Sequence, residues 1–222
     1  MSSKRELRIT GDSSYTLWDA DYGEHFHSGA GAIGESMHVF VQNGLNFARL
    51  HFPDALNILE MGFGTGLNAL LTCLHKQQTT INYTGIEKHP LPEEVWRLLQ
   101  YEQLEHDGQG MYYRIMQAEW NIPQRLHERF CLLKYNLDIL DYHPDPEAFH
   151  LVYFDAFSPA VVPELWSDTV FGRLFGALKP QGVLVTYSAK GDVKRALRNS
   201  GFKVERLPGF AGKRHMIRAV KP

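Results

Sequence analysis

Cysteine, long apolar runs and linker sequence are all scarce in this chain of 222 residues. The only cysteines, Cys73 and Cys131, are too few for a disulfide framework and lack the CxxC spacing typical of zinc sites. No apolar run approaches the roughly 18 residues that a membrane-spanning helix needs, and no apolar segment of a signal peptide follows the first residues. We therefore expect a cytoplasmic protein with reduced thiols and no membrane contact.

The charge is small in total but unevenly distributed. A net charge of -2 excludes a uniformly basic nucleic-acid-binding protein. Residues 1–185 hold 13 Lys and Arg against 23 Asp and Glu, whereas residues 186–222 hold 10 against 2. Two explanations stay open, a solvated basic face or a docking surface for a polyanion. In the second, phosphates would be contacted by Lys190, Lys194 and Arg198, spaced at four residues on a predicted helix, and by Lys213 and Arg214.

The chain contains no repeat or low-complexity segment, so we expect one domain over residues 1–222. Within it, residues 1–50 form an N-terminal extension. That extension has a hairpin region and glycine-rich loop at 7–31, followed by a helix from about Glu35 to Leu50. Residues 51–222 form the core.

Apolar strand patterns alternate with helical patterns through the core. Expected strands are Asn57–Met61, Ile81–Ile86, Phe130–Lys134, Phe149–Phe154 and Gly182–Tyr187, with helices that include about Pro163–Leu178 and Lys190–Asn199. A closing antiparallel pair is expected at Phe202–Leu207 and His215–Val220. The pattern predicts an α/β, Rossmann-like fold with a mostly parallel seven-stranded sheet and an antiparallel edge hairpin. This plan is similar to the class I methyltransferase fold.

A glycine-rich turn follows the first core strand, in the segment from Glu60 to Asn68. Its GxGxG spacing lacks the third glycine position of the GxGxxG dinucleotide fingerprint, which seats a helix around a pyrophosphate. S-adenosylmethionine has no phosphate, and its methionyl ammonium favours a nearby carboxylate. We therefore expect S-adenosylmethionine here, bound by Glu60, Gly62, Gly64, Gly66 and Asn68. A purely structural turn is the alternative.

Two acidic residues extend this cofactor hypothesis. Glu87 ends the second core strand, 21 residues after Gly66, where a carboxylate can accept hydrogen bonds from both ribose hydroxyls. Asp138 follows the third strand, where such folds often bind the adenine amino group. A helix N-cap is the competing role for Asp138.

The fourth core strand ends in Asp155-Ala-Phe157-Ser-Pro159, at the sheet edge where ligands bind. An acidic residue there can orient an amine and receive its proton, and it also borders the cofactor. Phe157 offers a face for stacking. Asp155 is therefore the candidate catalytic residue, with Tyr187 as helper, and capping of the loop is the alternative for Asp155.

These residues belong to longer motifs that resemble the methyltransferase domain of MnmC-type enzymes. The motifs are Thr16-Leu-Trp18, Tyr22 to Ser28, Gly34 to Phe40, Glu60 to Leu70, Tyr153 to Pro159, Pro163-Glu-Leu-Trp166, Thr186 to Gly191 and Gly212 to Met216. The glycine turn indicates only the superfamily. The Asp-Ala-Phe-Ser-Pro loop, the TYSAKG segment and the GKRxM segment are more specific.

The resemblance implies methylation of the 5-aminomethyl group of a wobble uridine in the anticodon region of tRNA. The product would be 5-methylaminomethyl-(2-thio)uridine. It also implies a stand-alone form without the flavin-dependent oxidoreductase domain, so that other enzymes would install the aminomethyl group. Phe157, Trp166 or the Tyr22–Ser28 loop would select the uridine, since unstacked bases are read by stacking and edge contacts.

Other functions remain open at this point. His25, His27 and His38 lie close in sequence, but methyl transfer of this type needs no metal, and we expect none. An aminopropyltransferase or a small-molecule N-methyltransferase could use the same turn, Glu87 and Asp155. A non-catalytic, RNA-binding methyltransferase-like protein would require the loss of cofactor residues, and none is lost.

Overall fold

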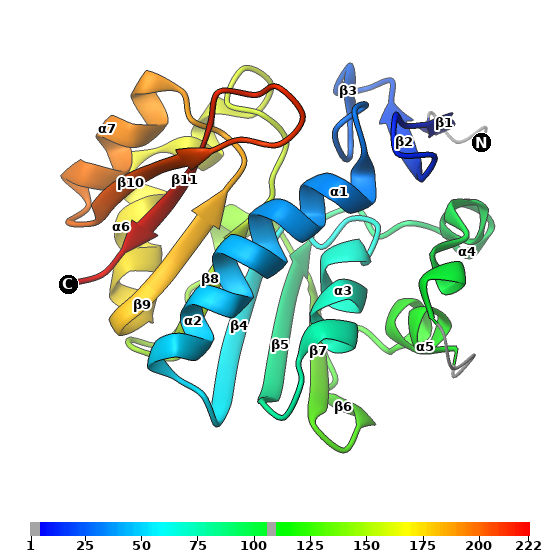
Figure 1. Cartoon of the computed structure of the whole chain (residues 1–222), viewed down its shortest axis with the longest axis horizontal. Helices are drawn as coiled ribbons and strands as arrows, with labels where there is room; N and C mark the ends of the chain where they lie inside the picture. Colours follow the sequence, from blue (N-terminus) through cyan, green and yellow to red (C-terminus); the bar gives the residue numbers. More distant parts are fainter. Residues whose placement is uncertain (1–4, 106–109) are drawn as a thin grey trace.

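The computed structural model describes residues 5–105 and 110–222, which contain one large sheet and one small sheet (Figure 1). The large sheet has eight strands in the order β10-β11-β9-β8-β4-β5-β7-β6. Its bounds are β4 (Ala55–Met61), β5 (Thr80–Glu87), β6 (Gln124–His127), β7 (Phe130–Asn136), β8 (Phe149–Phe154), β9 (Leu178–Thr186), β10 (Lys203–Pro208) and β11 (His215–Val220).

The central pairings are parallel, and both edges are antiparallel. Strand β4 pairs in parallel with β5 and β8, and these pair in parallel with β7 and β9 respectively. The predicted closing hairpin is confirmed as β10 and β11, with β11 antiparallel to β9. The expected Rossmann-like α/β fold is thus present.

The sheet has one strand more than predicted. Strand β6 pairs antiparallel with β7 at the other edge. Its four residues follow Pro123 and contain one buried apolar side chain, Leu126, so they show no alternating pattern for sequence analysis to detect.

Helices cover both faces of the large sheet (Figure 1). They are α1 (Ala32–Ser36), the π-helix η1 (Met37–Leu45), α2 (Asn46–His51), α3 (Leu67–His75), α4 (Glu93–Trp96), α5 (Met111–Gln117), α6 (Asp168–Ala177) and α7 (Gly191–Asn199). The 3-10 helices are η2 (Arg97–Leu99), η3 (Tyr101–Leu104), η4 (Ile139–Asp141) and η5 (Pro163–Trp166). No helix among residues 5–105 and 110–222 has the length and apolar character needed to cross a membrane.

Two predicted helices are present but differ in detail from the prediction. The helix expected at Glu35–Leu50 runs through α1, η1 and α2, with its middle in the π form. There a Cβ on Gly44 would lie 2.9 Å from Val185 Cγ2, so this helix packs very close to the sheet. The helix expected at Pro163–Leu178 is divided into η5 and α6 by Ser167, whose Oγ accepts a hydrogen bond from the amide of Val170 at 3.4 Å.

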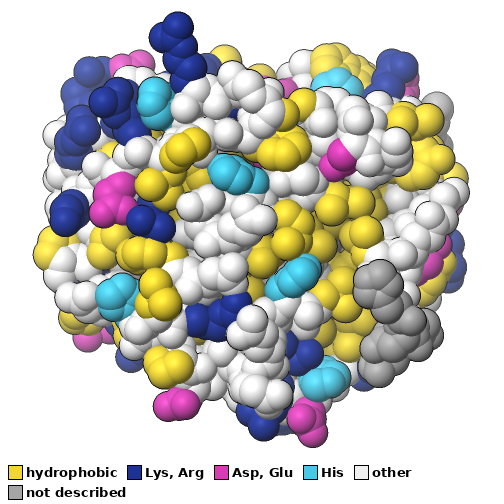
Figure 2. Space-filling view, viewed as in Figure 1, with side chains coloured by type: hydrophobic (Ala, Val, Ile, Leu, Met, Phe, Trp, Pro, Cys, Tyr) yellow, Lys and Arg dark blue, Asp and Glu magenta, His cyan; other side chains and the backbone are white. Residues whose placement is uncertain are grey.

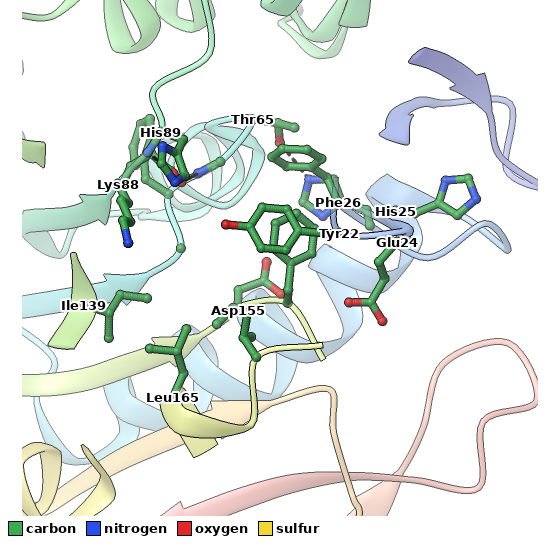
Figure 3. A pocket seen from close by; sticks show the side chains of 18 of the residues that line it. Tyr22, Glu24, His25, Phe26, Thr65, Lys88, His89, Ile139, Asp155 and Leu165 are labelled. Atoms are coloured by element: carbon green, nitrogen blue, oxygen red, sulfur yellow. Dashed lines mark hydrogen bonds between the residues drawn. The ribbon is translucent and has the colours of Figure 1, made fainter. Parts of the chain in front are cut away.

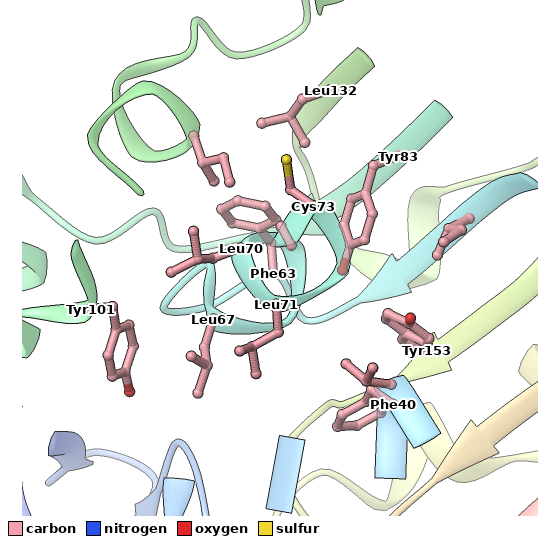
Figure 4. Close-up of a cluster of buried hydrophobic side chains, with 14 of the residues drawn as sticks. Phe40, Phe63, Leu67, Leu70, Leu71, Cys73, Tyr83, Tyr101, Leu132 and Tyr153 are labelled. Carbon is pink, nitrogen blue, oxygen red and sulfur yellow. The ribbon is translucent and has the colours of Figure 1, made fainter. Parts of the chain in front are cut away.

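Alternate residues of the strands enter two different cores, as the two-residue period of a strand requires. On β4, Ile58 belongs to the cluster beneath η1 and α3, while Leu59 belongs to the cluster beneath α6 and α7. Figure 4 shows the first cluster, in which Leu67, Leu70 and Leu71 of α3 lie among aromatic rings that include Tyr83 and Tyr153. Both faces of the sheet are therefore buried, which fixes its carboxyl edge as a rigid platform.

The small sheet is antiparallel and contains β1 (Arg5–Ile9), β2 (Tyr15–Asp19) and β3 (Glu24–His25). It lies beside the end of the large sheet toward which β4 and β5 run (Figure 1). The N-terminal segment contacts the glycine turn directly, because the ring of Phe26 lies where a Cβ on Gly64 would meet it at 3.2 Å.

Candidate active site

A cavity of about 440 Å³ lies between the carboxyl ends of the central strands and the N-terminal segment. Its floor includes Gly62 after β4, Glu87 at the end of β5 and Asp155 after β8. Figure 3 shows Tyr22 and Phe26 from the N-terminal segment on the side opposite Leu165. Ligands of open α/β folds bind at this edge, and the volume falls in the range of small-molecule sites.

The glycine turn approaches other backbone segments too closely for a side chain. Gly62, Gly64 and Gly66 have φ values of 92°, 49° and 74°. The amides of Gly62 and Phe63 both donate to the carbonyl of Ile86, at 3.1 and 2.9 Å. A Cβ on Gly62 would lie 2.7 Å from the carbonyl oxygen of Asp155. Glycine is therefore required where the β4 turn meets the β8 loop.

Only part of the predicted turn faces the cavity. Gly62 and Gly64 line it, whereas Glu60, Gly66 and Asn68 are not among its lining residues. Glu60 is 1 % exposed, and its carboxyl accepts hydrogen bonds from Tyr83 Oη and Asn68 Nδ2, both at 2.8 Å. Burial raises the pKa of Glu60 well above its usual range. This carboxyl thus supports the turn from behind.

Asn68 connects the buried carboxyl to the cavity. Its Nδ2 donates to Glu60 Oε1 and also to Asp155 Oδ2, each at 2.8 Å. Because Asn68 lies in the first turn of α3, the helix that follows the glycine turn holds the Asp155 side chain in place. Sequence reasoning placed Asn68 beside the cofactor and did not foresee this bridge.

Glu87 lines the cavity at the carboxyl end of β5. It is half-buried, with Oε2 accepting from the Gly64 amide at 2.9 Å and Oε1 accepting from the His89 amide at 2.8 Å. Each carboxylate oxygen retains a second lone pair for a ligand hydroxyl. The carboxylate is thereby preorganised at the tip of β5.

We predict that Glu87→Ala weakens the binding of S-adenosylmethionine by roughly 1–3 kcal/mol, because two ribose hydroxyls lose a charged acceptor. Isothermal calorimetry measures the change. Glu93→Ala, which removes an exposed carboxylate paired with Arg97 on α4, is the matched control and should bind the cofactor as the wild type does. Equal dissociation constants for wild type and Glu87→Ala would remove Glu87 from the cofactor site.

Asp138 also lines the cavity, but both of its oxygens have partners. Oδ1 accepts from the amide of Leu140 at 2.9 Å as the cap of η4, and Oδ2 lies 2.7 Å from Lys88 Nζ. The capping geometry considered as the alternative is therefore present. Ile139 and Leu140 after it add apolar walls to this end of the cavity.

Asp155 lines the cavity beside the aromatic residues of the β8 loop. Burial raises its pKa to about 8, with a further increase from Glu35, against the hydrogen bond from Asn68 and the charge of Lys213. The Asp155 carboxyl is thus largely protonated at neutral pH in the protein without ligand. A cation placed beside it would favour ionisation.

Aromatic rings surround the β8 loop. Phe157 stacks on Tyr22 with ring centroids 4.4 Å apart and meets Phe26 edge to face at 5.3 Å. Tyr187 lines the cavity, and its hydroxyl donates to the carbonyl of Ala156 at 2.9 Å. Trp166 does not line the cavity. It is buried, and its Nε1 donates to the carbonyl of Phe157 at 2.8 Å, so it supports the loop.

The five basic residues of the RNA hypothesis divide into two groups. Lys190, Lys194, Arg198 and Arg214 lie outside the cavity, whereas Lys213 lines it. Lys190 precedes α7 as its N-cap, so the predicted four-residue spacing begins one residue before the helix. Lys and Arg gather over α7 and the adjacent β10–β11 region in Figure 2.

Sequence analysis missed Glu35 as a functional candidate, and it named the Tyr22–Ser28 loop as a candidate for selecting the uridine without giving its residues a contact with the glycine turn. Glu35 and Phe26 line the cavity, and His27 Nε2 lies 2.7 Å from Thr65 Oγ1 of the glycine turn. Their segments precede the core in the chain, so no strand-end argument points to them. The density of motif residues between Tyr22 and Phe40 was the available signal.

The three histidines considered as metal ligands have other contacts. His25 meets Trp18 edge to face at 4.8 Å, and His38 Nε2 lies 2.8 Å from the carbonyl oxygen of Pro208. His27, paired with Thr65, has its pKa lowered to about 4 by burial. In the parts of the chain that the structure describes, no three metal-binding side chains form a cluster.

Comparison with known proteins shows what the carboxyl-terminal half of the chain and the fold resemble. Residues 123–222 match a family model described as S-adenosyl-L-methionine-dependent methyltransferase. A spermidine synthase from Thermotoga maritima has the same fold, with a TM-score of 0.57, 16% identity, and coverage of 100% of this chain and 71% of that one. Residues 123–222 are thus similar to S-adenosyl-L-methionine-dependent methyltransferases, and the whole chain has their fold.

Over most of its length the chain is similar to MnmC proteins. The chain is 34% identical to the tRNA 5-methylaminomethyl-2-thiouridine biosynthesis bifunctional protein MnmC of Azoarcus sp. (strain BH72) and 32% identical to that of Burkholderia mallei (strain SAVP1). These alignments cover 91% and 88% of this chain, which spans about a third of either relative (34% and 32%). The crystal structure of MNMC2 from Aquifex aeolicus superposes with a TM-score of 0.75 at 28% identity, covering 100% of this chain and 73% of that one.

The residues present fit S-adenosylmethionine. Gly62 and Gly64 line the cavity without side chains, and their turn lacks the phosphate-binding GxGxxG spacing. Carboxyl groups of Glu87 and Asp155 both line the cavity, as a ligand with ribose hydroxyls and positive charge requires.

Proposed function

We propose that this protein transfers a methyl group from S-adenosylmethionine to the 5-aminomethyl group of a wobble uridine in tRNA. The product is 5-methylaminomethyl-(2-thio)uridine. The observation that carries the proposal is the acceptor end of the cavity, where Asp155 lies beside the stacked rings of Tyr22 and Phe157. An aromatic base that carries an amine fits this combination. The MnmC similarity over most of the chain supports the same substrate.

In this proposal the two ends of the cavity bind different molecules. S-adenosylmethionine supplies an electrophilic methyl group. Glu87 holds the ribose, Gly62 and Gly64 allow close approach, and Ile139 and Asp138 border the adenine. Asp155 then orients the attacking amine, and the stacked aromatic rings hold the uridine. Rate enhancement arises chiefly from this positioning.

Proton transfer is assigned to Asp155. An alkylamine is mostly protonated at neutral pH, so its nitrogen must lose a proton before it attacks. The ammonium favours the ionised carboxylate, which can then receive the proton. Tyr187 holds the loop carbonyl of Ala156 and keeps its own proton, because burial raises the pKa of Tyr187 well above its usual range. Its role as helper is therefore to fix the loop.

The direct test uses tRNA isolated from cells that lack the final methylation. Purified protein and labelled S-adenosylmethionine should transfer label to this tRNA, and nucleoside mass spectrometry should find 5-methylaminomethyluridine. Spermidine and putrescine serve as competing acceptors. Label in the polyamines and none in tRNA would overturn the proposal.

We further propose that other enzymes install the aminomethyl group and that residues 1–50 and 51–222 function as one domain.

An aminopropyltransferase is the alternative on this fold. The likeness to spermidine synthase extends to the fold alone, at 16% identity. A cationic polyamine would be repelled by the basic surface, whereas tRNA phosphates would be attracted to it.

The tRNA is proposed to bind the basic surface defined by Lys190, Lys194 and Arg198. Lys190 and Arg198 are exposed, and none of the three forms an ion pair within the described part of the chain. Arg195, next to them, is paired with Asp192. Free cations of this kind release counterions from phosphates on binding.

We predict that the triple variant Lys190→Gln, Lys194→Gln, Arg198→Gln weakens tRNA binding. The slope of log K against the logarithm of the salt concentration should decrease in magnitude by about 2 to 3. Binding of S-adenosylmethionine should not change. The matched control replaces three arginines near the other edge of the sheet, Arg114, Arg125 and Arg129, by Gln. Fluorescence anisotropy at several salt concentrations gives the slopes. Equal slopes for the two triple variants would mean that the basic surface is only solvated.

A further inference from the structure

The loop between β10 and β11 is fastened to α1, far away in the sequence. A Cβ on Gly34 would lie 2.4 Å from Phe210 Cζ, so the phenyl ring rests directly on the backbone of α1. His38 Nε2 lies 2.8 Å from the carbonyl oxygen of Pro208, one helical turn further along. These contacts hold the end of β10 and the loop after it against α1 and η1, and Lys213 of this loop lines the cavity.

Lys213 forms an ion pair with Glu35 of α1. Its Nζ lies 2.5 Å from Glu35 Oε1 and 5.3 Å from the centre of the Tyr187 ring. The second carboxylate oxygen of Glu35 accepts from the Ser28 amide at 2.9 Å. The side chain of Glu35 is 8 % exposed and that of Lys213 is 43 % exposed. The pair is therefore anchored on its acidic side and accessible on its basic side.

We propose that Glu35 and Lys213 act together as a positioning pair that sets the charge state of Asp155 and hence the pH range in which the acceptor amine can lose its proton. This proposal deepens the proposed function and rests on it for the identity of the amine. It assigns Lys213 to the cavity, whereas the sequence had suggested a phosphate contact. Both members of the pair line the same cavity as Asp155.

The ionisable and polar groups around Asp155 come from several elements. Asn68 of α3 donates to it, Glu60 of β4 lies behind Asn68, and Tyr187 follows β9. Glu24 of β3 is fixed by the amide of Ser158 at 2.7 Å. Among the charged groups, Glu35 raises the pKa of Asp155 and Lys213 lowers it, while burial makes the largest contribution. The two members of the pair therefore act in opposite directions.

Because Glu35 and Lys213 change the pKa of Asp155 in opposite directions, the proposal has a distinctive test. Glu35→Gln keeps an acceptor for the Ser28 amide but removes the negative charge, so the pKa of Asp155 should fall by about one pH unit. Lys213→Met removes the positive charge and leaves Glu35 unpaired, so this pKa should rise by about one pH unit. The double variant should lie between the two. Glu205→Gln, which breaks the Arg218 ion pair on β10 and β11, is the matched control and should have no effect.

The measurement is carboxyl-carbon NMR of the whole protein labelled at aspartate, with Asp155 assigned from the resonance missing in Asp155→Asn. It needs no substrate, so it remains decisive if methylation of tRNA is not observed. If methylation of tRNA is not observed, opposite shifts of the Asp155 pKa in the two single variants would still support the positioning pair. Only the proposed function would then fail. With active protein, the pH profile of kcat should move in the same directions.

Two results would overturn the proposal. One is a titration of Asp155 that stays unchanged, or moves in the same direction, in both single variants. The other is a Lys213→Met protein with the wild-type titration but a flattened salt dependence of tRNA binding, as expected of a phosphate contact. Lys213 lies on an exposed loop, so its variant should fold even if Glu35→Gln does not.

Discussion

Asp155→Ala is expected to lower kcat for methylation of aminomethyl-tRNA by about 10²- to 10⁴-fold, which is the usual contribution of a positioned proton acceptor. The affinity for S-adenosylmethionine should fall much less, because Glu87 and the glycine turn remain. Single-turnover kinetics with labelled cofactor and calorimetry separate these effects. The loss of a group that acts on the amine should appear in kcat rather than in cofactor binding.

Asp155→Asn gives a sharper form of this test. Asn retains an oxygen that can accept from Asn68 Nδ2, as Asp155 Oδ2 does at 2.8 Å, but it cannot take up a proton. We expect turnover near that of the Ala variant. Wild-type turnover of Asp155→Asn at neutral pH would exclude the proton-acceptor role.

The raised pKa of Asp155 also predicts how this substitution changes stability. The folded state holds this proton up to about pH 8, whereas an aspartate in the unfolded chain releases it near its usual value of 3.8. Stability from the protonated group is therefore fully present below pH 3.8 and is lost as pH rises through 8. The free energy of unfolding of Asp155→Asn relative to wild type should thus increase between pH 5 and pH 9. Urea titrations at the two pH values measure it.

Gly62→Ala is expected to have the second largest effect. Its φ of 92° is unfavourable for any side chain, and the added Cβ would lie 2.7 Å from the Asp155 carbonyl oxygen. The backbone atoms on both sides must move, so the β4 turn and the β8 loop separate. We expect a loss of roughly 3 kcal/mol in the free energy of unfolding. The dissociation constant for S-adenosylmethionine should rise on the order of 100-fold, about 2.7 kcal/mol.

The control is Gly172→Ala in the middle of α6. A Cβ there meets nothing within 4 Å, and alanine favours the helix, so stability should increase by about 0.5–1 kcal/mol with cofactor binding unchanged. Urea unfolding and calorimetry are applied to both variants. A Gly62→Ala protein with wild-type stability and affinity would mean that the turn can relax, and that its close approach to Asp155 is not required.

Local patterns were sufficient for the sheet and for one side of the site. Strand β8 was predicted with its observed bounds, and β4, β5 and β7 within a few residues, because strands buried on both faces are continuous apolar runs. Glu87 and Asp155 could be placed at one edge because parallel strands end together. These predictions needed only the order of elements along the chain.

Orientation across that edge required the tertiary structure. Glu60 and Asn68 belong to the same turn as Gly62, yet neither lines the cavity. The pleat of β4 directs Glu60 toward Tyr83, and the start of α3 places Asn68 between Glu60 and Asp155. The two-residue period of a strand predicts which side chains lie on opposite faces of the sheet. It does not predict which face borders the ligand.

The sequence by itself thus determined the class of fold, the glycine turn and the acidic strand ends, since each depends on residues close together in the chain. Only the tertiary structure decided which distant side chains meet. Glu35 and Lys213 are separated by 178 residues, and Phe157 stacks on Tyr22 from the small sheet. No local period encodes such contacts, because they depend on how α1 and the N-terminal segment pack across the carboxyl edge of the large sheet.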